Sequence, residues 1–386
     1  MADLIRNSAA NSGPAAFVFA LSFHADYRCR HSGVCCSSDW DVPVEVPFYA
    51  SLNDAITAGR VRPVTGDPEG ALLTGADLPH DAGAMVARTA GGDCVFYHRP
   101  SGLCVVHRDL GESQLPATCR HFPRLAVRDR RGTFISLTHY CPTAAAALFR
   151  DDVAIEIVAA PAAFPPADYE GLVVEPDAWS PLLHPRMLMD ESSYSGWEQH
   201  MVARCATDDA SAESVVASLE RDARLLRPHR PSDGSLTAAV AALPADMVHV
   251  APESSLASSL RLYREVLRAV PEDLMPAADE GDLPEVYADG VLPSWCEWQR
   301  PLRRYLAAKA FASWTAYQGR GLLTIVRGLE AALALVRVEA ARQCRDHAHA
   351  LDRGLLLEAF RQADFMLNHL AVGEELARLW SEVEEG

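Results

Sequence analysis

The sequence predicts an α+β protein. A small, irregular, cysteine-rich metal-binding domain with short strands is expected to pack on a mostly α-helical domain. Seven of the ten cysteines lie between Cys29 and Cys141, among short runs that alternate as strands do. After a proline-rich stretch at 161–186 the pattern changes, and apolar residues recur every three or four positions. That spacing is typical of helices with one buried face.

The change of pattern divides the chain into four segments: a disordered tail at 1–15, a cysteine-cluster domain at 16–160, a proline-rich linker at 161–186 and a helical domain at 187–386. A chain of 386 residues is long enough for two domains. In the first domain we expect strands at 16–23, 42–46, 84–89, 133–139 and 154–159, a helix at 48–58 and a loop at 60–83. In the second we expect helices at 192–205, 211–226, 254–270, 295–317, 322–347 and 354–370.

Charge and composition limit the partners and the compartment. The net charge of −17 comes entirely from residues after 150, because residues 1–150 hold 14 arginines against 14 acidic residues. An acidic second half repels phosphate backbones, so we expect no nucleic-acid partner. No run approaches the ~18 apolar residues of a membrane span, and Asp3 weakens a secretory signal. We therefore expect a cytoplasmic protein with reduced thiols and no membrane partner.

The clustered cysteines are the candidate metal ligands, because thiolates bind zinc, copper(I) and iron–sulfur clusters. Their spacing is not that of a C-x2-C…C-x2-C zinc ribbon. Seven thiolates exceed the four of a closed zinc site, which favours an iron–sulfur cluster over zinc or mononuclear iron. The remaining cysteines each lie alone on a predicted helix and are expected to be uninvolved. The candidate ligands are Cys29, Cys35, Cys36, Cys94, Cys104, Cys119 and Cys141.

Two local expectations concern how these thiols could meet. Adjacent Cys35 and Cys36 would point to opposite sides of an extended chain, so they are not expected to share one zinc. Residues 94–107 predict a β-hairpin with a three-residue loop, which would place His98 opposite Cys104. In a straight hairpin Cys94 would then lie roughly 13 Å from Cys104, at about 3.3 Å per residue. Either the strand bends at 91–93, or there are two metal sites.

The cysteine motifs are similar to those of a known protein family. The run C-x5-C-C, then C-V-F-Y…G-L-C-V-V-H, then L-P-A-T-C-R-H-F-P resembles the zinc- or iron-chelating cysteine-cluster family. Trp40-Asp41-Val42 after the doublet and Cys141-Pro142 opening a helix resemble its flagellin lysine-N-methylase branch. The resemblance covers about residues 23–150. It implies an iron–sulfur or zinc centre and methyl transfer from S-adenosylmethionine to lysine side chains.

The chain departs from the family pattern at two places. Ser32 stands where many members have a further cysteine, and Leu115-Pro116 replaces the usual Arg-Pro before Cys119. The ligand set therefore differs from that of other members, and Cys29 is the least supported ligand. If the cluster serves methyl transfer, S-adenosylmethionine should bind the cysteine domain. The acidic helical half should then present a lysine-bearing protein.

Five arginines, two histidines and three acidic residues also lie near the cysteines, and their functional interpretations are less specific. The arginines could bind a carboxylate such as that of S-adenosylmethionine, although a solvated surface strand is the commoner explanation. The two histidines could be ligands or hydrogen-bond donors to ligands, and the acidic residues could act as bases toward an amine. No G-x-G-x-x-G, G-x-S-x-G, H-E-x-x-H or radical C-x3-C-x2-C motif is present. These arginines, histidines and acidic residues are Arg120, Arg124, Arg128, Arg130, Arg131, His121, His139, Asp39, Asp41 and Glu45.

Three functions are compatible with the sequence. The first is a metal-cluster-dependent protein lysine methyltransferase that uses S-adenosylmethionine. The second is an iron-dependent enzyme that modifies peptides oxidatively, which would need open coordination positions on the metal. The third is a non-catalytic zinc- or iron-chelating module with a helical interaction domain, which would need only a closed four-thiolate site.

Overall fold

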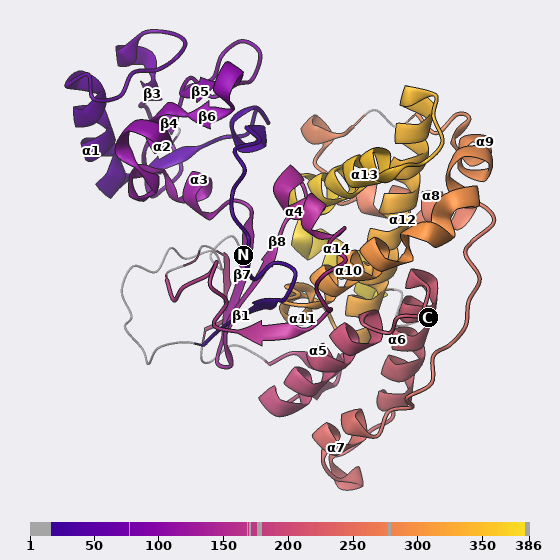
Figure 1. Cartoon of the computed structure of the whole chain (residues 1–386). Coiled ribbons are helices and arrows are strands. Elements are labelled where there is room, and N and C mark those ends of the chain that lie inside the picture. Colours follow the sequence, from indigo (N-terminus) through magenta and orange to yellow (C-terminus); the bar gives the residue numbers. More distant parts are fainter. Residues whose placement is uncertain are drawn as a thin grey trace. The chain divides into compact units, whose positions relative to one another are not determined.

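The computed structural model describes residues 17–382, apart from 77, 168, 170, 176–179 and 277–278. Helices are combined with small sheets, which is compatible with the predicted α+β class (Figure 1). The chain forms two compact units: a small one of residues 28–124, and a large one that combines residues up to 27 with residues from 125 onward. The predicted tail at 1–15 lies outside the described residues.

The sequence pattern placed the division between domains in the proline-rich stretch at 161–186, but the two units do not divide there. Residues 17–27 and 125–160 belong to the large unit, because strands from both segments pair in one sheet. Strand pairing between distant segments overrides a boundary that is read from composition alone. The cysteine-rich unit is therefore smaller than predicted.

The small unit has short elements around an apolar core that includes Val44, Ile56 and Phe96. Its three-stranded antiparallel sheet has the order β2-β4-β3, and β5 and β6 form a separate hairpin. The strands are β2 (Pro43–Glu45), β3 (Leu72–Leu73), β4 (Ala82–Val86), β5 (Tyr97–His98) and β6 (Leu103–Cys104). The α-helices are α1 (Val46–Thr57), α2 (Val105–Leu110) and α3 (Ala117–His121), and the 3-10 helices are η1 (Val34–Cys36), η2 (Pro68–Gly70), η3 (Arg99–Ser101) and η4 (Glu112–Gln114).

The large unit contains a five-stranded sheet of order β10-β7-β8-β1-β9. β1 pairs in parallel with β8, β10 pairs in parallel with β7, and β9 runs antiparallel to β1. Every residue of β8 is buried, so this strand lies inside the unit. A separate hairpin joins β11 to β12. The strands are β1 (Val18–Leu21), β7 (Arg124–Asp129), β8 (Gly132–Leu137), β9 (Ile157–Ala159), β10 (Gly171–Val173), β11 (Leu182–His184) and β12 (Met187–Leu188).

Helices make up most of the large unit, as the apolar periodicity predicted. Four of them begin at a Ser or Asp whose side chain accepts a hydrogen bond from the first turn, which stabilises the helix start. The α-helices are α4 (Pro142–Ala147), α5 (Glu191–Cys205), α6 (Ala212–Leu226), α7 (Leu236–Ala241), α8 (Ala257–Leu267), α9 (Leu283–Val286), α10 (Gln299–Ala310), α11 (Thr315–Gln318), α12 (Leu322–His347), α13 (Arg353–Phe365) and α14 (Gly373–Glu382). The other helical turns are η5 (Pro231–Asp233), η6 (Glu272–Leu274), η7 (Tyr287–Val291), η8 (Leu292–Trp298) and η9 (Met366–Leu370).

One predicted helix is wrong as a single element. The stretch 295–317 contains the end of η8, then α10, a break and α11. The break occurs because Phe311 is extended and Ala312 has a positive φ of 54°. Apolar spacing persists across this break, so periodicity alone does not reveal it.

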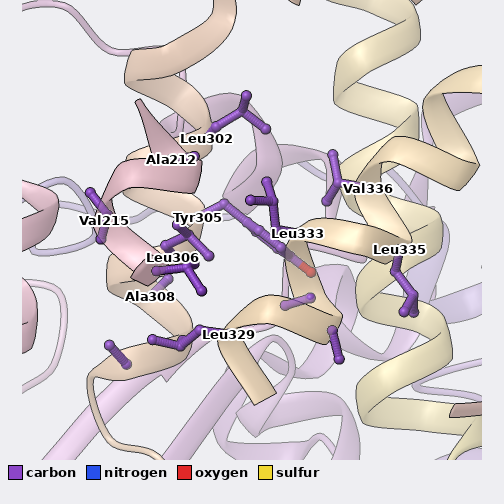
Figure 2. Packing of buried hydrophobic residues seen from close by; sticks show 14 of the residues in the cluster. Ala212, Val215, Leu302, Tyr305, Leu306, Ala308, Leu329, Leu333, Leu335 and Val336 are labelled. Atoms are coloured by element: carbon purple, nitrogen blue, oxygen red, sulfur yellow. The ribbon is translucent and has the colours of Figure 1, made fainter. Parts of the chain in front are cut away.

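Helix α12 lies at the centre of the large unit and packs against α6, α8, α10, α13 and α14. Leu329, Leu333 and Val336 of α12 are buried in the same cluster as Leu306 of α10 and Val215 of α6 (Figure 2). Both long faces of the helix are covered, so its apolar content reflects burial within protein. In the described part of the chain, no helix has the length and apolar character needed to cross a membrane.

Candidate metal centre

The cysteine doublet lies on a 3-10 turn rather than an extended chain. Gly33 precedes the turn with φ of 76°, and a Cβ there would come within 2.0 Å of the Tyr97 hydroxyl. Because the chain is coiled, the Sγ atoms of Cys35 and Cys36 lie 3.9 Å apart. Two sulfurs on one tetrahedral zinc, each at about 2.3 Å, would be separated by roughly 3.8 Å. The expectation that these two thiols point apart is therefore wrong.

Cys94 approaches the doublet because the chain bends before the hairpin. Its N–H donates to the carbonyl oxygen of Cys36 at 2.7 Å. Its own carbonyl accepts from the N–H of Tyr97 at 2.9 Å, which closes a turn. Cys94 is thus outside β5, and the straight hairpin that would separate it from Cys104 does not form. Of the two alternatives, the structure has the bend.

The hairpin register also differs from the prediction. Tyr97 pairs with Cys104 and His98 pairs with Leu103, so the loop has four residues. Gly102 closes it with φ of 66°, where a Cβ would meet the carbonyl oxygen of His31 at 2.6 Å. His98 therefore does not face Cys104, and its Nδ1 lies 2.6 Å from the Ser101 hydroxyl.

Cys104 is one of two thiols in the group whose pKa is lowered. It lies at the start of α2, and its sulfur interacts with the backbone N–H groups of Val106 and His107. A hydrogen bond with Cys36 is the largest cause, and together these bonds lower the pKa of Cys104 to about 7. The Cys36 thiol also hydrogen-bonds Cys35, and the pKa of Cys35 falls while that of Cys36 rises. Cys36 thus donates to two neighbours that carry thiolate character.

Two further thiols lie within electrostatic range. Burial is the main cause that raises the pKa of Cys94 to about 11 and that of Cys119 well above its usual value. Both are raised further by Cys35 and Cys104, so the five sulfurs act on one another as like charges when ionised. Arg88 is the cation that opposes this effect for Cys35, Cys94 and Cys119.

Arg88 is held beside the thiols by backbone oxygens. Its guanidinium donates to the carbonyls of Cys36, Gly92 and Trp40. The carboxylate of Glu45 accepts from the N–H of Ala117 at 2.8 Å and fixes the start of α3, the helix that carries Cys119. Glu45 thus orients an element of the site, a role that its proximity to the doublet did not indicate.

The other two candidate ligands are differently placed. Cys29 is exposed, and its sulfur accepts from the N–H of His31 at 3.3 Å. Cys141 belongs to the large unit, where it precedes α4 and lies 3.6 Å from the hydroxyl of Tyr27. The geometry of the small unit thus groups five of the seven predicted ligands. The remaining cysteines, Cys205, Cys296 and Cys344, lie on α5, η8 and α12 of the large unit.

Among the residues that the structure describes, no three His, Cys, Asp or Glu side chains are arranged to hold a metal ion. The donor chemistry nevertheless suits a soft metal: five sulfurs, at most partly exposed, with Cys35 and Cys36 at the separation that a shared ion requires. A cation would also offset the burial and the mutual repulsion that raise the pKa values of Cys94 and Cys119. The residues fit a thiolate-bound metal in the kind of donor atom, and in the separation of the Cys35 and Cys36 sulfurs.

The large unit contains a second polar cluster, which the sequence pattern did not indicate. His139 donates through its backbone N–H and its Nδ1 to the buried carboxylate of Asp364. The same carboxylate accepts from the hydroxyl of Tyr305 at 2.7 Å and pairs with Lys309 at 2.5 Å. His24 completes the cluster, with its Nε2 3.3 Å from that of His139. These residues come from β1, β8, α10 and α13 and their flanks, so no local motif links them.

The tautomers in this cluster follow from the partners. Because Nδ1 of His139 donates to Asp364, its Nε2 is the acceptor and Nε2 of His24 is the donor. Burial lowers the pKa of both imidazoles, so both are neutral at neutral pH. His139, two residues from Cys141, is therefore turned toward a carboxylate. The predicted alternative of a metal ligand is not what its contacts show.

Comparison with known proteins identifies no relative: no family model, no curated protein and no solved structure matches this chain.

Proposed function

We propose that the small unit binds a metal centre through Cys36, Cys94, Cys104 and Cys119, with Cys35 as a fifth, neighbouring ligand. The observation that carries this proposal is the convergence of five interacting thiols in one unit of 97 residues, 28–124. Thiols that repel one another when ionised gain most from a bound cation. The small unit would then be a cysteine-rich metal-binding domain, and the mostly helical large unit would be a second domain.

An iron–sulfur cluster is the form that we propose, with zinc or mononuclear iron as alternatives. A four-iron cluster takes four thiolates, which leaves one thiol of the five beside it, and Cys29 and Cys141 outside it. Such a cluster would supply electron transfer or an electrophilic iron. The chain contributes the soft ligands, the burial that excludes water and the positive charge of Arg88 beside them.

The deciding experiment is anaerobic purification of the full chain, followed by iron, zinc and sulfide analysis and an absorption spectrum. Cys119→Ser should lower metal content, because it removes one of four expected ligands. Cys296→Ser is the matched control, since this exposed cysteine lies in the large unit. Equal metal content in the two variants would refute the assignment, and stoichiometric zinc without sulfide would replace the iron–sulfur form.

We also propose, from the resemblance to flagellin lysine-N-methylases, that the protein transfers a methyl group from S-adenosylmethionine to lysine side chains of another protein. The acidic charge of residues after 150 suits a basic substrate. The test is incubation of the metal-loaded protein with S-adenosylmethionine and lysine-rich peptides, read by mass spectrometry. A gain of one methylene mass per lysine is expected. Metal binding with no transfer to any peptide would leave a non-catalytic or oxidative metal protein.

A further inference from the structure

The small unit holds one more thiol than a four-thiolate metal centre uses. Cys36, Cys94, Cys104 and Cys119 fill the four positions of the proposed centre, so Cys35 remains beside it. Cys35 is also the direct neighbour of a proposed ligand, because its Sγ lies 3.9 Å from that of Cys36. The extra thiol is therefore placed where it can react with a ligand sulfur.

Hydrogen bonds to the backbone hold the turn that carries this pair. The indole Nε1 of Trp40 donates to the carbonyl oxygen of Cys35 at 3.1 Å. The N–H of Cys94 donates to the carbonyl oxygen of Cys36 at 2.7 Å. Both carbonyls of the doublet are thus fixed by residues outside the turn, and the two sulfurs stay neighbours.

The two thiols differ in their exposure to solvent. Cys35 is partly exposed, whereas Cys36 is only 9 % exposed. A small oxidant that arrives from solvent therefore meets Cys35 first. An oxidised cysteine that lies next to a second thiol is converted to a disulfide when the second sulfur attacks it. An accessible thiol with such a partner beside it is typical of redox-sensing cysteines.

A disulfide between adjacent residues is easy to reduce. Consecutive Cα atoms are about 3.8 Å apart, whereas the Cα atoms of ordinary disulfides are about 4.4–6.8 Å apart. A bond between neighbouring cysteines is therefore strained, and strained disulfides are reduced readily. Such a bond suits a reversible state rather than a permanent cross-link.

We propose that Cys35 and Cys36 form a reversible disulfide that withdraws Cys36 from the metal centre. The oxidant is a low-molecular-weight disulfide. The Cys35 thiolate attacks one of its sulfurs, and the first small thiolate leaves. The Cys36 thiolate then attacks the Cys35 sulfur and displaces the second small thiolate. The two cysteines lose two electrons in total, and the small disulfide is reduced to two thiols.

The protons also balance in this exchange. Each small thiolate takes up one proton, and a free cysteine thiol releases one when it reacts. A Cys36 thiolate that is already a metal ligand brings no proton, so the second small thiolate then takes its proton from water.

The consequence for the metal rests on the proposed four-thiolate centre, whereas the pairing of the two cysteines does not. The thiolate is the form of cysteine that binds a metal, and a sulfur in a disulfide is no longer a thiolate. Oxidation would leave the centre with three of its four ligands, which favours release of the metal. Reduction of the disulfide would return Cys36 to the centre.

The test treats the full-length protein, as purified anaerobically, with hydroxyethyl disulfide, and measures the released metal. Free thiols are then alkylated and the chain is digested with trypsin. The tryptic peptide 31–60 contains Cys35 and Cys36 and no other cysteine. It should lose two hydrogens and escape alkylation as the metal is released, and dithiothreitol should restore both thiols.

Three results of the peptide mapping would overturn this pairing. The first is a peptide 31–60 that stays reduced, and the second is one that carries only mercaptoethanol adducts. The third is a peptide 31–60 that is joined to the peptide of Cys104. A disulfide within 31–60 that causes no release of metal would overturn the withdrawal of Cys36.

Variants separate this pairing from general oxidation. In Cys35→Ser, the fraction of the variant's own metal that is released should fall about tenfold in rate relative to the wild type. Cys29→Ser, which removes an exposed thiol of the same unit, is the control and should release metal at the wild-type rate. Equal rates in Cys35→Ser and the wild type would refute the role of Cys35. If Cys35→Ser holds no metal, the peptide mapping of the wild-type chain still decides.

The pairing and the metal centre can fail separately. A purified chain that holds no metal but forms the disulfide within 31–60 would sustain the pairing and end the metal proposal. A metal-loaded chain that forms no such disulfide would do the reverse.

Discussion

The two units solve the burial of polar side chains in opposite ways. In the large unit, the carboxylate of Asp364 is fully buried but is surrounded by Lys309, Tyr305 and the N–H groups of His139. The cation and the donors are supplied by the chain itself, which holds the pKa of Asp364 well below its usual value. In the small unit five thiols gather around one arginine, Arg88, and most of their pKa values rise.

This difference is the reason that we interpret the first cluster as a structural network and propose the second as a ligand site. The first cluster is complete, because each charge has its partner inside the protein. The second has donors of one kind and too little positive charge to ionise them together. Thiols of this kind are stabilised when a metal supplies the missing positive charge. Loss of the metal should therefore destabilise the small unit, and loss of the Asp364 carboxylate should destabilise the large unit by a smaller amount.

The largest effect should follow metal removal. Stripping the protein with a strong chelator should unfold the small unit, because thiolate zinc sites supply apparent free energies of about 10 kcal/mol or more. Hydrogen exchange should show lost protection in 28–124 and unchanged protection in α12. Protection that persists in both units after complete metal removal would show that the thiol cluster is stable without a metal.

Loss of the buried carboxylate should have the next largest effect, in the large unit. Asp364→Asn leaves the ammonium of Lys309 without its buried partner, and we expect the free energy of unfolding to fall by about 3–5 kcal/mol. Urea denaturation, monitored by tryptophan fluorescence, measures this free energy of unfolding. Asp346→Asn, at a surface pair with Arg345, is the control and should change stability by about 0.5 kcal/mol at most. Similar values for both would mean that the network is not coupled to folding.

The same network predicts acid sensitivity. Burial lowers the pKa of His24 and His139. It also lowers to about 4 the pKa of His369, whose Nε2 lies 3.3 Å from the Thr138 hydroxyl and whose charge is influenced by Asp364 and Lys309. In the unfolded chain these imidazoles titrate near 6.5, so below that pH the unfolded state binds protons that the folded state does not. Stability is therefore full above pH 6.5 and falls as the pH drops toward 4. For His369 alone the loss is on the order of 3 kcal/mol at about 1.4 kcal/mol per pKa unit.

Urea midpoints between pH 7.5 and 4.5 measure this dependence. His369→Gln should flatten the profile, whereas His80→Gln, which changes an exposed imidazole, should leave it unchanged. A wild-type profile that is flat between pH 6.5 and 4.5 would show that these histidines are not buried in the neutral form.

The smallest effect concerns the turn that brings the doublet together. Gly33→Ala places a Cβ against the Tyr97 hydroxyl at a positive φ, and should destabilise the small unit by roughly 1–2 kcal/mol. Metal content should fall together with stability, because Cys35 and Cys36 lie in the turn that begins directly after Gly33. Gly70→Ala is the control, since nothing lies within 4 Å of its added Cβ. Unchanged metal affinity in Gly33→Ala would show that the turn is not needed to form the site.

Part of the fold was predictable because it depends on local patterns. The stripe from Leu322 to Cys344 recurs with the helical period, and α12 spans that segment. The strand and helix after the doublet correspond to β2 and α1, although α1 begins two residues earlier than predicted, with Pro47 in its first turn. Local geometry that depends on one hydrogen bond was predictable only in part. A bend before Cys94 was one of two alternatives, whereas the four-residue hairpin loop was not predicted.

By itself, the sequence determined the kind of protein: helices after residue 187, short strands before 160, an acidic second half and a concentration of thiols that suits a soft metal. Tertiary structure alone decided which thiols meet and where the chain divides. Cys141 joins the large unit because β8, just before it, pairs with β1 more than 100 residues away. Lys309 meets Asp364 because α10 and α13 both lie against α12. Such contacts depend on packing between distant segments, for which spacing along the chain carries no signal.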